Sequence, residues 1–132
     1  MCELNRYRRY QKTLTLSDVF PSKKNLCACG CGKKLPKNRK KWASDRCRSI
    51  AVERFFIIKG DSRIIRNKLF SEEKGICQIC FNFDIEWEAD HIMPVYCGGG
   101  GLGIDNYQTL CKECHKFKSS LYQSSRHHIL IS

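Results

Sequence analysis

Residues 77–115 read "CQICFNFDIEWEADHIMPVYCGGGGLGIDNYQTLCKECH". This stretch begins with a C-x2-C pair, Cys77 and Cys80, and ends in a second pair, Cys111 and Cys114, with 30 residues between the pairs. Two such pairs can supply four thiolates to one tetrahedral zinc ion. The sequence therefore predicts a structural zinc at these four cysteines, which would join the start of the segment to the start of its last helix.

A second group of cysteines lies upstream, in "CACGCGKKLPKNRKKWASDRC", residues 27–47. Its spacing is less regular, but four thiols are again present, and the glycines between them suit tight turns. We expect a second zinc at Cys27, Cys29, Cys31 and Cys47. Cys2 and Cys97 are left over and are expected to be ordinary cysteines.

Apolar residues recur at helical spacing from residue 44 onward. Ser44 or Asp45 would cap this helix and Gly60 would end it, and a second helix would follow, closed by Gly75. Strand-like segments at 85–92 and 104–110 and a short helix in 111–121 complete an α+β pattern. The expected organisation is a basic arm (1–26), a zinc-knuckle and helix annex (27–60), a core (61–122) and a tail (123–132).

The formal net charge is +11. Eight zinc-bound thiolates would lower this to roughly +7, so a polyanion is the natural partner and nucleic acid is the commonest one. A merely soluble basic protein is the alternative. The arm "NRYRRYQK" can contact phosphate and bases or be a solvated tail. No leader pattern and no run of about 18 apolar residues is present, so an intracellular location without membrane contact is expected.

Four polar residues surround the first cysteine framework. Asp90 and His91 lie at the end of a predicted strand, Asn106 follows the glycine-rich loop, and His115 directly follows the last cysteine. Each has an ordinary alternative, such as a turn residue or a spare zinc ligand. Because neighbours on a strand point to opposite faces, Asp90 and His91 are expected to have different tasks.

The segments "ADHIMPV", "GGGG", "DNYQTLC" and "KECHKFK" resemble the HNH endonucleases of the ββα-metal fold. The likeness extends over roughly residues 27–120 through "WASDRC", "ERFFIIKGD" and "KGICQIC". The chain is similar to bacterial and phage members of this family and to the HNH module at the C-terminal end of a eukaryotic annealing helicase. The resemblance implies a small zinc-stabilised, treble-clef-like nuclease core with an N-terminal zinc-knuckle and helical extension.

The resemblance also implies roles for the four residues. Asp90 and His115 would hold one divalent metal, His91 would be the general base, and Asn106 would bond to backbone near His91. Carboxylate and oxygen ligands favour magnesium or manganese, and the imidazole also tolerates nickel or zinc. DNA nicking or cutting would leave a 5′ phosphate and a 3′ hydroxyl.

Three lysines in the last predicted helix are candidates for contact with DNA. Lys118, on the same helical face as His115, is a candidate phosphate contact, and Lys112 and Lys116 are weaker ones. A recruiting protein and the oligomeric state are left open. Many relatives read "CSxxC" where this chain has Ala43 to Cys47, so the extra cysteine upstream would supply the missing ligand. A noncatalytic zinc-organised DNA-binding module and an RNA-binding zinc protein are the alternative functions.

Overall fold

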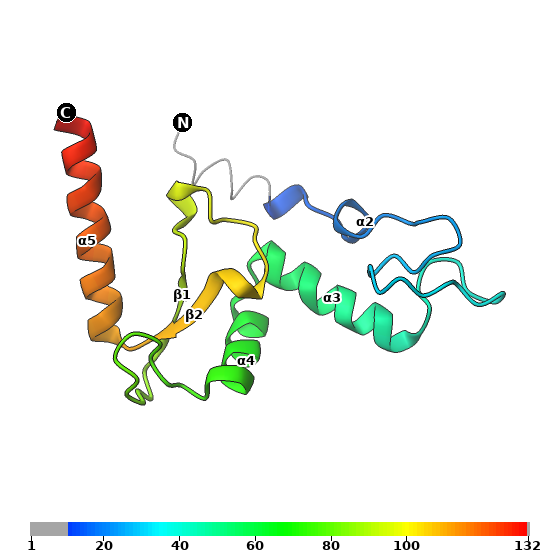
Figure 1. Cartoon of the computed structure of the whole chain (residues 1–132), viewed down its shortest axis with the longest axis horizontal. Helices are drawn as coiled ribbons and strands as arrows, with labels where there is room; N and C mark the ends of the chain where they lie inside the picture. The colour runs from blue at the N-terminus through cyan, green and yellow to red at the C-terminus, as the bar shows by residue number, and fades with distance from the viewer. Residues whose placement is uncertain (1–10, 132) are drawn as a thin grey trace.

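The computed structural model describes residues 11–131, so residues 1–10 of the predicted basic arm (1–26), with most of "NRYRRYQK", lie outside the described residues. Figure 1 shows a small two-stranded sheet with α5 on one side and α3 and α4 on the other. The elements, in chain order, are α2 Leu16–Val19, α3 Asp45–Lys59, α4 Ser62–Glu73, β1 Glu88–His91, η1 Val95–Cys97, η2 Ile104–Asn106, β2 Tyr107–Leu110 and α5 Lys112–Ile131. The predicted α+β class is confirmed.

The two predicted central helices begin at the expected caps. The Ser44 side chain accepts a hydrogen bond from the backbone N–H of Cys47, and Asp61 caps α4 in the same way. Such caps satisfy N–H groups that have no partner within the helix. Helix α3 ends at Gly60 in a left-handed conformation, as predicted, whereas α4 ends at Lys74, one residue before the predicted glycine.

Strands β1 and β2 pair antiparallel, with Asp90 opposite Gln108 and His91 opposite Tyr107. Both strands are shorter than the predicted segments. Residues preceding β1 form a turn, because the Asp84 carboxylate accepts the Glu86 backbone N–H at 2.9 Å. Residues preceding β2 form the short helix η2.

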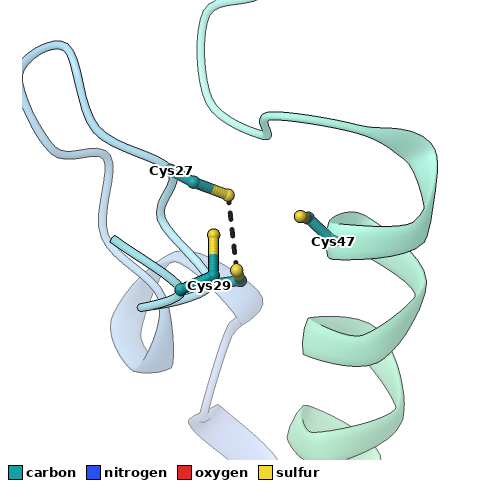
Figure 2. A group of neighbouring side chains, drawn as sticks. Cys27, Cys29 and Cys47 are labelled. Atoms are coloured by element: carbon teal, nitrogen blue, oxygen red, sulfur yellow. Dashed lines mark hydrogen bonds between the residues drawn. The ribbon is translucent and has the colours of Figure 1, made fainter. Parts of the chain in front are cut away.

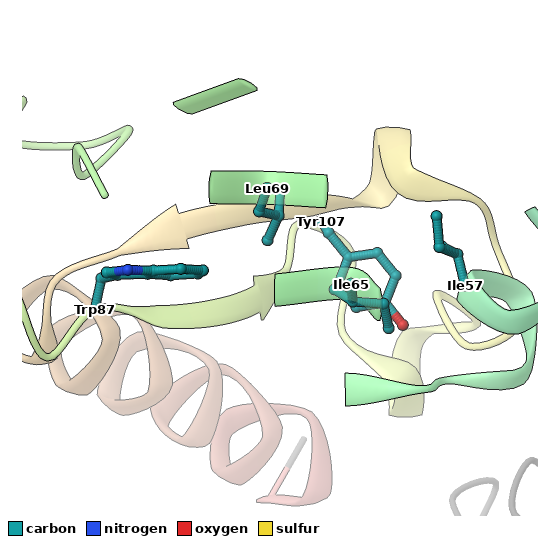
Figure 3. Packing of buried hydrophobic residues seen from close by; sticks show 5 residues of the cluster. All are labelled: Ile57, Ile65, Leu69, Trp87 and Tyr107. Atoms are coloured by element: carbon teal, nitrogen blue, oxygen red, sulfur yellow. The ribbon is translucent and has the colours of Figure 1, made fainter. Parts of the chain in front are cut away.

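A small apolar core lies between α4 and one face of this sheet, and Figure 3 shows its side chains. Its members are Ile57, Ile65, Leu69, Trp87 and Tyr107. The end of α4 is also tied to β2, because the Glu73 carboxylate accepts both the backbone N–H (2.8 Å) and the hydroxyl (3.0 Å) of buried Thr109. The core thus fixes α4 and the sheet as one body.

Helix α5 has 20 residues and runs alongside β1 in Figure 1, so it is longer than the short helix predicted in 111–121 and continues into the segment predicted as a tail (123–132). The physical reason is that residues 112–131 contain neither glycine nor proline, so no residue stops the helix. Among residues 11–131, no helix has both the length and the apolar character needed to cross a membrane.

Candidate functional site

The first cysteine cluster has the dimensions of a zinc site. One ligand atom from each of Cys77, Cys80, Cys111 and Cys114 lies within 4.8 Å of every other, and the Cys80 and Cys111 sulfurs are 3.8 Å apart. Four sulfurs at about 2.3 Å from one zinc ion lie roughly 3.8 Å from one another. The cluster joins the loop before β1 to the turn between β2 and α5, as predicted.

Cys77 is fully buried and its environment favours a thiolate. Burial alone would raise the pKa of this thiol, but hydrogen bonds from the backbone N–H groups of Cys80, Cys111 and Ile79 lower it to about 6. A zinc ligand must be deprotonated. The backbone N–H groups around Cys77 therefore stabilise the thiolate form that binds zinc.

The second cluster brings together the other four predicted cysteines, Cys27, Cys29, Cys31 and Cys47, again within 4.8 Å. Figure 2 shows the Cys47 thiol, at the start of α3, facing those of Cys27 and Cys29. The backbone N–H of Ala43 donates to the Cys27 sulfur at 3.2 Å. The two cysteine clusters could therefore each hold a zinc ion, and the second would anchor the N-terminal annex to α3.

Glu88 and Asp90 present their carboxylates to α5, from the same face of β1. The imidazole of His115 lies between them: its Nδ1 is 2.6 Å from a Glu88 oxygen and its Nε2 is 3.5 Å from Asp90 Oδ1. Because the Glu88 carboxylate contacts Nδ1, Nε2 lies on the side of Asp90. This is the arrangement by which a carboxylate orients a metal-binding histidine.

Asp90 is almost buried, and two further side chains contact its carboxylate. The Lys118 ammonium forms an ion pair with Oδ2, and Gln108 Nε2 donates to the same oxygen at 3.0 Å. Lys118 also donates to the backbone carbonyls of His91 (2.5 Å) and Ile92 (3.1 Å). Lys118 therefore ties α5 to the end of β1, in addition to offsetting the Asp90 charge.

His91 lies on the other face of β1, as the strand alternation predicts. Its ring contacts Tyr107, with 4.6 Å between the ring centroids. Burial lowers the pKa of His91 below its ordinary 6.5, the charge of Lys118 adds to this effect, and that of Asp90 opposes it. Its buried Nε2 has no hydrogen-bond partner among the described residues. The His91 imidazole, with its unpaired Nε2, thus directly follows Asp90 in the chain and lies on the opposite face of the strand.

Asn106 fastens the loop that follows β1. Its Oδ1 accepts the Met93 N–H at 2.9 Å, and its Nδ2 donates to the carbonyls of Met93 (3.1 Å) and Gly99 (2.8 Å). The loop approaches so closely that a Cβ at Gly99 would lie 1.7 Å from the Met93 oxygen. The glycine and Asn106 together hold the loop against the chain that leaves His91.

A cavity of about 280 Å³ opens between β1 and α5. Its lining includes Asp90, His91, His115 and Lys118. Two donors bound to one ion at about 2.1 Å each lie roughly 3–3.5 Å apart, so Asp90 Oδ1 and His115 Nε2, 3.5 Å apart, fit a shared divalent ion. The carboxylate and imidazole donors also suit magnesium, manganese or a later transition metal.

Some of these contacts were not expected from the sequence. Glu88 could have been found, because it lies two residues before Asp90 and therefore shares its face of the strand. The contacts of Gln108 and Tyr107 depend on the register of the two strands.

Of the other predicted lysines, Lys112 pairs with Glu86 at 2.8 Å near the first cysteine cluster, and Lys116 is exposed on α5.

Comparison with known proteins adds a second line of information. The DNA annealing helicase and endonuclease ZRANB3 of Homo sapiens is 27% identical over 128 aligned residues, covering 64% of this chain and 12% of the relative. The same protein of Bos taurus is 25% identical over 139 aligned residues, covering 73% of this chain and 13% of the relative. The chain thus spans about an eighth of the length of these relatives. No solved structure matches it.

The model of the HNH endonuclease family matches residues 77–121. This range begins at the first zinc-cluster cysteine and includes both strands and the first half of α5. It contains all four polar residues on which the resemblance rested. The predicted resemblance to the HNH endonucleases is therefore confirmed for residues 77–121.

Proposed function

We propose that this chain is a metal-dependent DNA endonuclease that hydrolyses phosphodiester bonds with His91 as the general base. The observation that carries the proposal is the placement of His91 beside Asp90 and His115 within the segment that matches the HNH family. A general base must be unprotonated at working pH and must be able to reach the attacking water. The lowered pKa of His91 supports the first requirement, and its side chain lines the cavity that Asp90 and His115 share.

Asp90 and His115 would hold the catalytic metal ion, with Glu88 orienting the imidazole. A bound magnesium or manganese ion would neutralise charge on the scissile phosphate and on the leaving 3′ oxygen. His91 would accept the proton as the water oxygen bonds to phosphorus and the bond to the 3′ oxygen breaks. The products would be a 5′ phosphate and a 3′ hydroxyl.

The charge distribution supports DNA as the substrate. All 24 Lys and Arg residues lie in 1–74 and 112–132, so they flank the acidic segment that contains Asp90. Lys116, exposed on α5, is suited to contact phosphate directly. Lys118 is already bound to the Asp90 carboxylate and to a backbone carbonyl at the end of β1, so it would bind phosphate only after these contacts break. An intracellular location and a recruiting protein stay predictions.

The test is nicking of supercoiled plasmid with added magnesium or manganese. Asp90→Asn keeps the size of the side chain and removes one metal-binding charge, so we expect loss of nicking. Glu86→Gln is the matched control, because Glu86 is an exposed carboxylate in the same segment and pairs with Lys112 at the surface. Its nicking rate should equal that of the unchanged protein.

The alternative is a zinc-organised module that binds DNA without cleaving it. The same preparations distinguish the two functions through a gel-shift measurement of DNA affinity. A protein that binds DNA but nicks none under magnesium, manganese, nickel or zinc would show that the enzyme proposal is wrong. Nicking that persists undiminished in Asp90→Asn would also refute the assigned site.

A further inference from the structure

The zinc-knuckle loop carries several exposed apolar side chains that lie outside the core cluster. Residues 79–87 read "ICFNFDIEW", with apolar and polar positions alternating strictly except for Cys80, a member of the zinc cluster. Such alternation is typical of a strand with one buried face. Only the last apolar residue, Trp87, is buried, whereas Ile79, Phe81, Phe83 and Ile85 are exposed by 47%, 74%, 63% and 83%. These four form what we call the knuckle stripe.

Phe81 gives a second, independent observation. Its backbone has φ +62°, a left-handed conformation that is unusual for a bulky residue and that glycine or asparagine adopts more readily. The side chain contributes nothing to the core to offset this strain. An aromatic residue held in strained backbone and pointing to solvent indicates a role outside the fold.

The backbone beneath the stripe is well fixed. Cys77 N–H donates to the Asn82 carbonyl at 2.9 Å, Phe81 N–H donates to the Cys77 carbonyl at 2.8 Å, and residues 76 and 83 form an isolated bridge. The apolar side chains are therefore presented on a preformed surface, which reduces the entropy lost on binding.

The charge of this region indicates the class of partner. Residues 75–111 contain no Lys or Arg. Of the two carboxylates between the apolar positions of the stripe, that of Glu86 pairs with Lys112 at 2.8 Å, and that of Asp84 accepts backbone N–H groups. The Asp84 carboxylate therefore carries the remaining negative charge at the stripe. Phosphate groups would be repelled there, whereas a positively charged peptide would be attracted. The stripe precedes β1, whereas Asp90 and His91 are the last two residues of that strand.

We infer that the knuckle stripe is the docking surface for another protein, through a segment that combines large apolar residues with Lys or Arg. Large exposed apolar side chains that the fold leaves uncovered are typical of protein–protein contact surfaces, where a few such side chains supply most of the binding energy. The inference does not depend on the nuclease activity, since the stripe shares no residue with Asp90, His91 or His115.

The test begins with a library of random 12-residue peptides displayed on phage, selected on the immobilised zinc-loaded chain. Enriched sequences are then synthesised, and their affinities are measured by fluorescence anisotropy. We expect peptides that carry at least two large apolar residues and a net positive charge. The double variant Phe81→Asn, Ile85→Ser should bind them at least about tenfold more weakly.

Controls separate the surface from the fold. Asparagine accepts the left-handed backbone at position 81, so the double variant should keep its zinc content, melting temperature and plasmid nicking; Ile85→Ser alone is the second variant. Phe117→Gln changes a side chain on α5 that is as exposed as Phe83, and its peptide affinity should be unchanged. A selection without basic apolar peptides, or equal binding by the stripe variants, would overturn the inference. So would a loss of DNA affinity with peptide binding intact, which would assign the stripe to nucleic acid.

Discussion

Replacing Cys77 by serine tests whether the first cysteine cluster is a structural metal site. Cys77 is fully buried, and its sulfur is one of the four cysteine sulfurs of this cluster that lie within 4.8 Å of one another. Structural zinc contributes about 10–16 kcal/mol of binding free energy that is coupled to folding. Even a quarter of this, roughly 3–4 kcal/mol, is a large part of the ~5–15 kcal/mol by which folded domains are stable.

We therefore expect Cys77→Ser to lose one zinc ion per chain and to melt at least about 10 °C lower. Zinc is measured by plasma mass spectrometry and melting by circular dichroism. Cys97→Ser is the matched control, because Cys97 is an exposed free cysteine outside both clusters, and it should keep full zinc content and melting temperature. A Cys77→Ser protein with unchanged zinc content and melting would refute the reasoning.

The remaining predictions concern catalysis, pH and stability. His91→Asn should lower the nicking rate by about 10²–10⁴-fold, with melting and metal affinity almost unchanged; a variant that nicks normally would remove His91 from the mechanism. Because burial lowers the pKa of His91 below 6.5, the base is neutral at pH 7 and the nicking rate should fall only as pH drops below about 6.5. A rate that falls already between pH 8 and 7 would contradict this. Glu73→Ala removes the acceptor of two Thr109 hydrogen bonds and should cost about 2–3 kcal/mol of unfolding free energy. The exposed neighbour Glu72→Ala should cost less than about 0.5 kcal/mol, and urea unfolding measures both.

Local features of the sequence were enough to predict much of this fold. Ser44 and Gly60 mark the ends of α3 because capping depends on side chains within a few residues. The two C-x2-C pairs predict a shared site because their spacing is itself the signature of zinc binding. Both kinds of inference need only short-range chemistry, and both agree with the structure.

Contacts between distant elements could not be predicted in the same way. The position of Tyr107 against His91 follows from the register of two strands, which a shift of one residue would reverse. The bonds from Lys118 to Asp90 and to the end of β1 require the packing angle of α5, which no local pattern specifies. The length of α5 was missed because a helix without a stop signal gives no mark of where it ends.

His115 is joined by a single peptide bond to Cys114, so the first cysteine cluster and the site proposed for the catalytic metal share one stretch of backbone. A chelator added to this protein would therefore act on two timescales. Removal of the weakly held divalent ion would stop the reaction at once, and adding magnesium back would restore it. Slow extraction of zinc would instead release Cys114 and move His115 with it, so that magnesium alone would no longer bring activity back. The time of exposure to chelator, rather than its concentration, would decide whether the loss is reversible.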